Sequence, residues 1–464
     1  MISLPELAAI APGGWLVGGA VRDRVLGRSC TDFDVVVAGD AQEPARALAR
    51  ATGGHCFALS DRFGAWRVID RDRRWQVDVM TLIGETIEAD LARRDLTINA
   101  IAEPLGGGAP IDPFGGLEDL AAGRIRMVSD SAFQEDPLRV LRVARLACEL
   151  GFIAELATVG AARAAAPALD GVAGERIFAE LKRIVCADRA LDGLRLMDVT
   201  GATTVVLPEL AALHGVEQSA YHHRDVHDHT LLVLRETIML ARDPGAQFPD
   251  HAEALQELLA EPLADGLTRG QALRFGALLH DAAKPQTRAV NAEGRVTFLG
   301  HDRAGADLAR AVLGRLRASE RLADHVAALT RRHLVLGFLV NQVPLDRRAV
   351  YRYMRACEPV EVDVTLLSVA DRLATRGRGS DQAIAKHLQL AHQLVGEALS
   401  WRAAPPQPPV RGDRLARAIG IRPGPRLGEL LRELEQETFA GEIGSEEEAI
   451  ARARELLGSI GSPP

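Results

Sequence analysis

Apolar runs in the first 130 residues predict a small β-sheet. The run DFDVVV begins at Asp32 and is rich in β-branched residues. The segments WRVID (66–70) and WQVDVMTL (75–82) flank the polar turn RDRR, a pattern typical of a β-hairpin. Helix-like segments at 43–52 and 91–102 lie among these runs without a regular βαβ order. We therefore expect an α+β fold that begins with a mixed sheet.

From about residue 131 onward, apolar residues recur with the 3.6-residue period of α-helices. The segment EDPLRVLRVARLACEL (135–150) places Leu138, Leu141, Val143 and Leu146 near one face. The same period recurs in four further segments: 174–185, 221–240, 268–284 and 302–316. We expect the remainder of the chain to be all helical.

Composition along the chain predicts its division into parts. The 464 residues exceed what one ordinary hydrophobic core accommodates. The proline-rich segment AAPPQPPVRGD (403–413) is the clearest linker, and short helical stretches follow it. The predicted parts are a head, a neck, a body and a tail, at 1–130, 131–215, 216–402 and 411–464.

Charge and cysteine content narrow the possible functions. The net charge of −8 argues against nucleic-acid binding over the whole surface, although it permits a local basic track. The five scattered cysteines form no CxxC pair, which excludes a disulfide framework or a cysteine zinc site. The chain has neither a signal-like N-terminus nor a run of about 18 apolar residues. We expect a soluble cytoplasmic protein that spans no membrane.

Two carboxylates, Asp32 and Asp34, stand two residues apart at the entry to the DFDVVV strand. Alternate residues of a strand point to the same face, so these groups repel each other unless a cation lies between them. Magnesium prefers oxygen ligands and substrate phosphates. Upstream, Gly18 and Gly19 allow backbone N–H groups to approach a triphosphate closely. Two arginines are placed to neutralise such a triphosphate: Arg22 and Arg28. A surface turn with two solvated carboxylates would show the same spacing.

The neighbouring segments resemble, in order, the motifs of class II tRNA nucleotidyltransferases and bacterial poly(A) polymerases. GGAVRDRVLGRSCTDFDVVV (18–37) resembles the opening motif, LARRDLTINA (91–100) the ribose-recognition motif and DPFGG (112–116) the hinge motif. EDPLRVLRVAR (135–145) resembles the nucleotide-selecting motif, and ERIFAEL (175–181) the helix that braces it. The resemblance covers nearly the whole chain and implies a small nucleotidyltransferase head followed by a helical neck, body and tail.

The resemblance also implies roles for individual residues. The catalytic Mg²⁺ ligands would be Asp32 and Asp34. The triphosphate site would be shaped by Gly18, Gly19, Arg22 and Asp23. Arg94 and Asp95 would contact the ribose, where a carboxylate accepting from the 2′-hydroxyl explains a preference for ribonucleotides. Alternatively, the sequence RRD is a charge cluster at a helix start. Asp78 is either a third carboxylate near the metals or a surface residue of the hairpin.

Asp136 and Arg139 offer an acceptor and a donor three residues apart, hence on one face of the predicted helix. Cytosine and adenine both present an amino donor beside a ring-nitrogen acceptor, whereas uracil and guanine present the reverse. The resemblance assigns the selection of C and A to this pair, with about 1–3 kcal/mol of discrimination per bidentate contact. Alternatively, Asp136 caps the helix and Arg139 is its intrahelical partner, and the two roles can coexist. Arg142 and Arg145 continue the same side and could meet phosphate.

The activity implied is the addition of C, A or both to the 3′ end of tRNA from CTP and ATP. The connection TLIGETIEA (81–89) is short. Members of the resembled family that add the whole CCA usually carry a longer basic loop hereabouts, and the CC-adding members lack it. Our hypothesis from this difference is a CC-adding enzyme. The alternative within the family is a poly(A) polymerase that acts on RNA generally.

Four histidines and two aspartates on successive predicted helices form a second candidate metal site: His229, His280, Asp281, His301, His333 and Asp371. A lone buried histidine is more often structural. Here, however, the adjacent His280 and Asp281 can place two ligands on one ion. Imidazole with carboxylate suits transition metals such as Ni²⁺, Mn²⁺, Co²⁺ or Zn²⁺. The nearby His222, His223 and His227 receive no role.

This order of residues resembles the HD superfamily of metal-dependent phosphohydrolases, with Lys284 in its HDxxKP form. The resemblance implies phosphomonoesterase or 2′,3′-cyclic phosphodiesterase activity. Alternatives are a degenerate domain that only braces tRNA, an HD hydrolase with an inactive transferase head, and a purely structural RNA-binding protein. The oligomeric state is not indicated by the sequence.

Overall fold

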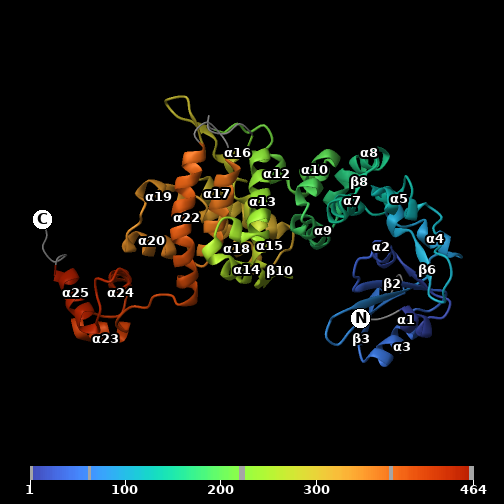
Figure 1. Cartoon of the computed structure of the whole chain (residues 1–464), viewed down its shortest axis with the longest axis horizontal. Helices are drawn as coiled ribbons and strands as arrows, with labels where there is room; N and C mark the ends of the chain where they lie inside the picture. The colour runs from blue at the N-terminus through green and yellow to red at the C-terminus, as the bar shows by residue number, and fades with distance from the viewer. Residues whose placement is uncertain (1–3, 61–63, 219–224, 376–379, 459–464) are drawn as a thin grey trace. The chain divides into compact units, whose positions relative to one another are not determined.

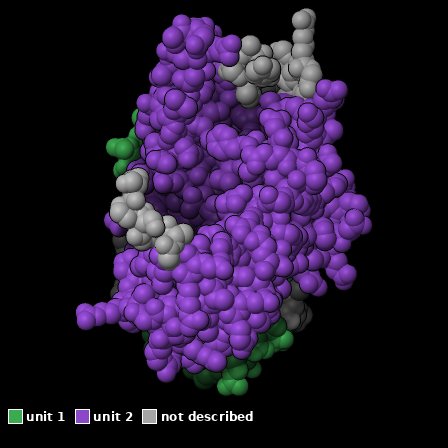
Figure 2. Space-filling view, turned by 90° about the vertical axis from the view of Figure 1, so that its left-hand side faces the viewer, with its two compact units in different colours: residues 1–208 green, residues 209–464 purple. Residues whose placement is uncertain are grey.

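The computed structural model describes residues 4–60, 64–218, 225–375 and 380–458, so His222 and His223 lie outside the described residues. The chain forms two compact units, residues 1–208 and residues 209–464 (Figure 2). None of the described helices combines the length and the apolar character needed to span a bilayer.

A six-stranded mixed sheet forms the first part of unit 1, in the order β3-β4-β5-β2-β1-β6 (Figure 1). Its strands are β1 (Trp15–Val17), β2 (Asp32–Val37), β3 (His55–Ser60), β4 (Ala65–Ile69), β5 (Gln76–Thr81) and β6 (Ala102–Pro104). Strands β2 and β5 run parallel, and the other neighbours are antiparallel. The predicted mixed sheet and the β4–β5 hairpin are confirmed.

Alternation along β2 separates core side chains from site side chains. Phe33 and Val35 are buried on one face. On the other face, Val36 packs in a cluster with Ile87 and Leu91 of helix α4 (Ile87–Leu91). The sheet is therefore covered beside Val36, while the entry to β2, where Asp32 is exposed, stays accessible.

The helix expected over 91–102 is wrong. Helix α4 ends at Leu91, and a turn leads to the 3₁₀ helix η1 (Thr97–Asn99) and then to β6. The Asp95 carboxylate accepts the N–H of Leu96, and the Asp95 carbonyl accepts the N–H of Val128. These bonds replace the helical pattern, because a distant segment supplies a partner that the local period does not reveal.

The helix expected over 135–150 begins later than its apolar pattern indicates. Helix α6 (Ala132–Glu135) ends before Asp136, and α7 (Arg139–Leu150) begins three residues further on. Asp136 is extended, with φ −147° and ψ 103°, because a residue that precedes a proline disfavours the helical region. The premise that Asp136 and Arg139 share a helix face is therefore wrong.

The remainder of unit 1 is mostly helical. It contains α1 (Leu4–Ile10), α2 (Gly19–Val25), α3 (Gln42–Thr52), α5 (Gly116–Ala122), α8 (Leu156–Ala165), η2 (Ala166–Gly171), α9 (Gly174–Cys186), α10 (Ala190–Thr200) and α11 (Ala202–Val206). A two-stranded ladder joins β7 (Arg124–Ile125) to β8 (Ile153–Ala154). Helix α7 packs against both α9 and α10. These contacts fix its position beside Asp95, which lies in the turn between α4 and η1.

Unit 2 is predominantly helical, as predicted, and it also contains two short ladders, β9 (Pro262–Ala264) with β10 (Leu267–Thr268) and β11 (Ala289–Val290) with β12 (Val296–Thr297). Its longer helices are α13 (Val226–Arg242), α14 (Ala252–Ala260), α15 (Arg269–Leu279), α17 (His301–Arg315), α18 (Glu320–Arg332), α20 (Arg347–Cys357), α21 (Glu361–Ala374) and α22 (Ser380–Ala403). The proline-rich linker follows α22. Figure 1 shows the three helices that come after it, α23 (Gly412–Ile419), α24 (Pro425–Phe439) and α25 (Glu446–Gly458). They enclose an apolar cluster of their own.

Candidate nucleotide and metal sites

A cavity of about 630 Å³ in unit 1 collects residues from four separate segments of the sequence. The predicted residues that line it are Gly18, Gly19, Arg22, Asp23, Asp32, Asp34, Arg94, Asp95, Asp136, Arg139, Arg142 and Arg145. Tertiary folding thus brings together the segments that resemble the triphosphate, metal, ribose and nucleotide-selecting motifs. The lining also includes residues that the sequence did not single out, among them Arg93 and Asn99.

Three carboxylates share one face of the sheet at the entry to this cavity. In the parallel β2–β5 pair, Asp34 lies opposite Asp78, and Asp32 lies opposite Gln76, whose amide donates to it at 2.8 Å. Burial and the neighbouring Asp78 and Asp32 carboxylates raise the pKa of Asp34 to about 6, against the opposing effect of Arg94. Such crowding of like charge fits a bound divalent cation.

Asp78 lies in the sheet and not on a surface turn. The Arg67 guanidinium donates two hydrogen bonds of 2.7 Å to its carboxylate. Asp78 therefore already has a full countercharge, unlike Asp32, and it is not among the residues that line the cavity.

Gly18 directly follows β1 and lies against the metal-ligand candidate Asp34. Its φ of +72° favours glycine, and a Cβ at this position would lie 3.0 Å from Asp34 Oδ2 and 2.8 Å from Arg94 Nη1. A side chain here would displace both groups, so the glycine is required by close packing as well as by conformation.

A buried chain of hydrogen bonds joins the opening motif to the ribose motif. Arg22 donates to Asn99 Oδ1 at 2.7 Å and to both oxygens of Asp23. Asn99 in turn donates to Asp95 at 3.0 Å, and Arg142 donates to Asp95 at 2.6 Å. Burial alone would raise the pKa of Asp95, but the Arg142 guanidinium and the Asn99 amide hold it well below its usual range. Asp95 is thus a fixed, charged acceptor.

Asp136 and Arg139, the two residues predicted to select the base, are each held by partners from other segments. Arg176 of α9 donates to Asp136 at 2.7 Å. Arg139 donates to the carbonyl oxygens of Arg93 at 2.6 Å and Ala132 at 2.9 Å. Asp136 also accepts the N–H of Leu138 at 3.2 Å, so a contact at the helix start coexists with its place in the cavity. Arg176 was not predicted, although its helix was compared with the brace of the selector.

The other predicted arginines differ in their surroundings. Arg145 is buried and donates to Glu180 at 2.5 Å and to Glu149 at 2.9 Å, which occupies its guanidinium. Arg28 does not line the 630 Å³ cavity; it lines an adjacent hollow of about 450 Å³ and donates to the Glu149 carbonyl at 3.3 Å.

The six residues predicted for the second site lie together in unit 2. They form two groups, His229, His280 and Asp371, and Asp281, His301 and His333. Within each group the candidate ligand atoms lie within 4.8 Å of one another. His229 Nε2 lies 3.0 Å from Asp371 Oδ1, and His301 Nε2 lies 3.4 Å from Asp281 Oδ1.

Backbone carbonyls orient three of these imidazoles in the same way. The Nδ1 atoms of His280, His301 and His333 lie 2.8, 2.7 and 2.6 Å from carbonyl oxygens three residues upstream. When Nδ1 donates, Nε2 carries the lone pair, as metal ligation requires. The donor set therefore fits a transition metal.

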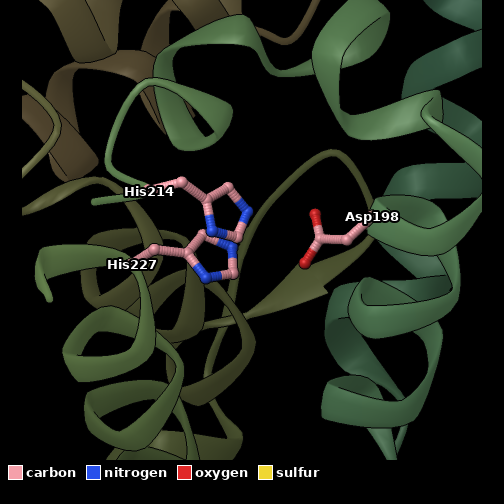
Figure 3. Close-up of side chains that lie close together, drawn as sticks. All are labelled: Asp198, His214 and His227. Carbon is pink, nitrogen blue, oxygen red and sulfur yellow. The ribbon is translucent and has the colours of Figure 1, made fainter. Parts of the chain in front are cut away.

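Lys284 also forms an ion pair with Asp281, the carboxylate at the centre of this site. Lys284 Nζ lies 2.7 Å from Asp281 Oδ2. Burial would raise the pKa of Asp281, but His280 and Lys284 hold it well below its usual range. His227, which received no role, is buried, and its ring stacks on that of His214 with the centroids 3.6 Å apart (Figure 3).

Family comparisons match these two units. Residues 14–126 match the Poly A polymerase head domain, residues 151–213 the probable RNA and SrmB-binding site of polymerase A, and residues 226–376 the HD domain. An A-adding tRNA nucleotidyltransferase of Deinococcus radiodurans is 36% identical over 96% of this chain and 96% of its own length. A CC-adding tRNA nucleotidyltransferase of Thermus thermophilus is 34% identical over 94% of this chain and 92% of its own.

Solved structures share the fold. A CCA-adding enzyme in its apo form has a TM-score of 0.66 and 21% identity, over 99% of this chain and 94% of its own. The Thermotoga maritima CCA-adding enzyme complexed with tRNA has a TM-score of 0.61 and 22% identity, over 98% of this chain and 94% of its own. With near full-length relatives above 30% identity, the chain belongs to the tRNA nucleotidyltransferase family and carries both its poly(A) polymerase-type head and an HD domain.

Proposed function

We propose that this nucleotidyltransferase adds C, A or both to the 3′ end of tRNA, with CTP and ATP as substrates and with Asp32 and Asp34 as ligands of Mg²⁺. The observation that carries the proposal is the convergence of Asp34, Asp95, Asp136 and Arg139 on one cavity. The relatives support the substrate, because those named above are A-adding and CC-adding tRNA enzymes.

Within this cavity the chain's own residues bind and orient the substrates. Gly18 gives a triphosphate close access to the backbone, and Arg22 and Arg94 supply positive charge. Asp95, kept ionised by Arg142, accepts from a ribose hydroxyl. Asp136 and Arg139 read the shared edge of cytosine and adenine and mismatch uracil and guanine.

The crowded carboxylates at Asp32 and Asp34 would hold the divalent cations. When bound, such a pair activates the 3′-hydroxyl and stabilises the leaving pyrophosphate. Arg142 and Arg94 moderate the negative charge around Asp34, so the site does not depend on the cation alone for neutralisation.

The short connection between β5 and α4 carries our proposal for how many nucleotides the enzyme adds. Only Leu82–Thr86 separate β5 from α4. This short connection favours a CC-adding enzyme, while the relatives' names divide between A-adding and CC-adding. An incorporation assay decides which nucleotides are added. Labelled CTP and labelled ATP are offered separately, with magnesium, to tRNA lacking its last three nucleotides and to tRNA ending in CC. We expect C on the first substrate and no A on the second.

Other outcomes of this assay have equally definite meanings. Addition of both nucleotides in order indicates a CCA-adding enzyme, and A on the CC-ending tRNA alone indicates an A-adding enzyme. Untemplated A-tails on any RNA would replace the proposal with a poly(A) polymerase. No incorporation at all would overturn the transferase proposal.

A second activity is proposed for the HD site, because four histidines and two carboxylates meet there and backbone carbonyls orient three of the imidazoles for metal ligation. We propose phosphomonoesterase or 2′,3′-cyclic phosphodiesterase activity with Ni²⁺, Mn²⁺, Co²⁺ or Zn²⁺. These six residues would hold the metal, which would supply Lewis-acid activation of water for phosphate-ester hydrolysis. Hydrolysis of p-nitrophenyl phosphate that is lost in Asp281→Ala supports the proposal. No hydrolysis with any of these metals indicates a domain that only braces tRNA.

A further inference from the structure

One row of residues crosses the sheet of unit 1 from the end of β1 to the edge strand β3 (Figure 1). In register, Val17 lies opposite Asp34, Asp34 opposite Asp78, Asp78 opposite Arg67 and Arg67 opposite Phe57. Residues directly opposite each other on neighbouring strands point to the same side of a sheet. Phe57 and Arg67 therefore share the face that carries the candidate metal ligand Asp34.

The two ends of this row differ in what they can bind. Gly18, in the proposed triphosphate site, directly follows Val17 at one end. In an in-line displacement, the attacking and the leaving oxygen lie on opposite sides of the phosphorus. The 3′-oxygen of the RNA must therefore reach the α-phosphorus from the side away from the pyrophosphate. From Asp34, that side is the one toward β5, β4 and β3.

The far end of the row presents exposed apolar side chains. Phe57 is 44% exposed, and Leu59, two residues further along β3, is 42% exposed. Helix α3 packs against β4 on the opposite face, where Arg46 lies over the Trp66 ring. Strand β3 contains none of the charged residues or prolines that usually protect a sheet edge. The exposed ring of Phe57 offers a flat surface on which a nucleic-acid base can stack.

Arg67 supplies positive charge between the carboxylates and Phe57. Its Nε and Nη2 each donate to the Asp78 carboxylate at 2.7 Å. Its side chain is 28% exposed, and Nη1 has no hydrogen-bond partner among the residues that the structure describes. The ion pair with Asp78 therefore holds the guanidinium in place, while Nη1 can donate to a phosphate oxygen.

We propose that the 3′-terminal segment of the RNA that receives the nucleotide lies on this face, across β5, β4 and β3. A base stacks on Phe57, and a phosphate accepts from Arg67. The inference deepens the proposed nucleotide addition and rests on it. Three strand spacings, about 14 Å, separate Asp34 from Phe57, so the stacked base belongs to one of the last two nucleotides. Stacking suits this position, because the terminal base changes with each addition and every base has a π-face.

Fluorescence of 2-aminopurine tests this stacking without catalysis. The probe replaces the last or the next-to-last base of a tRNA that ends before its final nucleotide, and no nucleoside triphosphate is present. We expect binding to the wild type to quench the probe at one of these two positions. Phe57→Ala should lose this quenching, Phe57→Tyr should restore it, and Phe57→Leu, which is apolar without a ring, should not.

Steady-state kinetics give a second readout. Phe57→Ala should raise the KM for tRNA about tenfold and leave the KM for CTP within about twofold. Arg67→Lys keeps the charge beside Asp78 but loses the guanidinium fork, so it should raise the KM for tRNA several-fold. Matched controls are Ile153→Ala, an exposed apolar residue of β8, and Arg50→Gln, on the helix that covers the opposite face. Neither control should change either KM.

The failure of this inference differs from the failure of nucleotide addition itself. If the wild type adds nucleotides but Phe57→Ala keeps the quenching and the KM for tRNA, the stacking surface is wrong and the transferase stands. If the wild type sediments as a dimer and Phe57→Ala as a monomer with equal RNA binding, β3 instead contacts a second copy of the chain. No incorporation by the wild type with any RNA would overturn both proposals.

Discussion

At the scale of single residues, the ionised carboxylate of Asp34 in the candidate nucleotide site lowers the stability of the metal-free folded protein. Its carboxylate is largely enclosed beside Asp32 and Asp78, and burial together with these charges raises its pKa from 3.8 to about 6. A carboxyl group whose pKa is higher in the folded than in the unfolded protein binds protons more readily when folded. The metal-free protein therefore loses stability as the pH rises from about 4 to about 6.

We predict that Asp34→Asn stabilises the metal-free protein above pH 7 by about 1–2 kcal/mol while abolishing nucleotide addition. The gain should shrink strongly toward pH 4, where Asp34 is protonated in the folded protein and about half protonated in the unfolded one. Scanning calorimetry with chelator at pH 4 and pH 7.5 measures it, with exposed Glu43→Gln as the control. Equal stability of Asp34→Asn and the wild type at pH 7.5 would contradict the crowding of charge at this site.

Arg176 is a candidate positioning residue, because its hydrogen bond of 2.7 Å holds Asp136, for which base reading is proposed. We predict that Arg176→Ala lowers the ratio of kcat/KM for CTP over UTP about tenfold, and that Arg176→Lys restores part of it. Steady-state incorporation of each nucleotide measures this ratio. The exposed Arg195→Ala on α10 is the control. An unchanged ratio with reduced overall activity would indicate a merely structural role.

At the scale of elements, α7 is the connection between the sheet and the helical neck. It carries Arg142 toward Asp95 and Arg145 toward Glu180 of α9. Both bonds cross from one element to another in largely buried surroundings, so they fix the helix in position as well as in orientation. A shift of α7 would move Arg139 and Arg142 relative to Asp95.

We predict that Glu180→Ala destabilises unit 1 by about 2–3 kcal/mol, because the buried Arg145 would keep only its bond to Glu149. Asp192→Ala, which removes an exposed ion pair with Arg189, should cost less than about 1 kcal/mol. Denaturant unfolding of both variants provides the comparison. Equal, small effects would mean that the Arg145–Glu180 pair does not anchor α7.

At the scale of the whole molecule, the two candidate sites belong to different compact units and share no residue. The candidate metal ligands differ in type: they are carboxylate oxygens in the head, and imidazoles with carboxylates in the HD domain. The finer division into parts at 1–130, 131–215, 216–402 and 411–464 remains a prediction.

We predict that the two activities separate cleanly. Asp34→Asn should abolish C and A addition and leave phosphate hydrolysis within about twofold, while Asp281→Ala should do the opposite. Parallel assays on the same purified variants measure both activities. Loss of both activities in either soluble, folded variant would show that the sites depend on each other.

The amino-acid sequence by itself determined the motifs and the elements with a strong local period. The strand after Asp32, the hairpin around RDRR and the long helices of unit 2 follow from alternation and helical period, which are local properties. The six residues of the HD cluster could also be predicted to lie together, because their residue types recur at helix positions in a recognisable order.

Only the tertiary structure decided the turn at 92–100, the late start of α7 and the contacts of the arginines. Asp95 leaves the helical pattern because Val128, Asn99 and Arg142 supply its partners. Arg28 faces a different hollow, and Arg176 reaches Asp136 from a helix forty positions away. Local periodicity cannot indicate these contacts, since long side chains choose among partners that only the folded chain brings within reach.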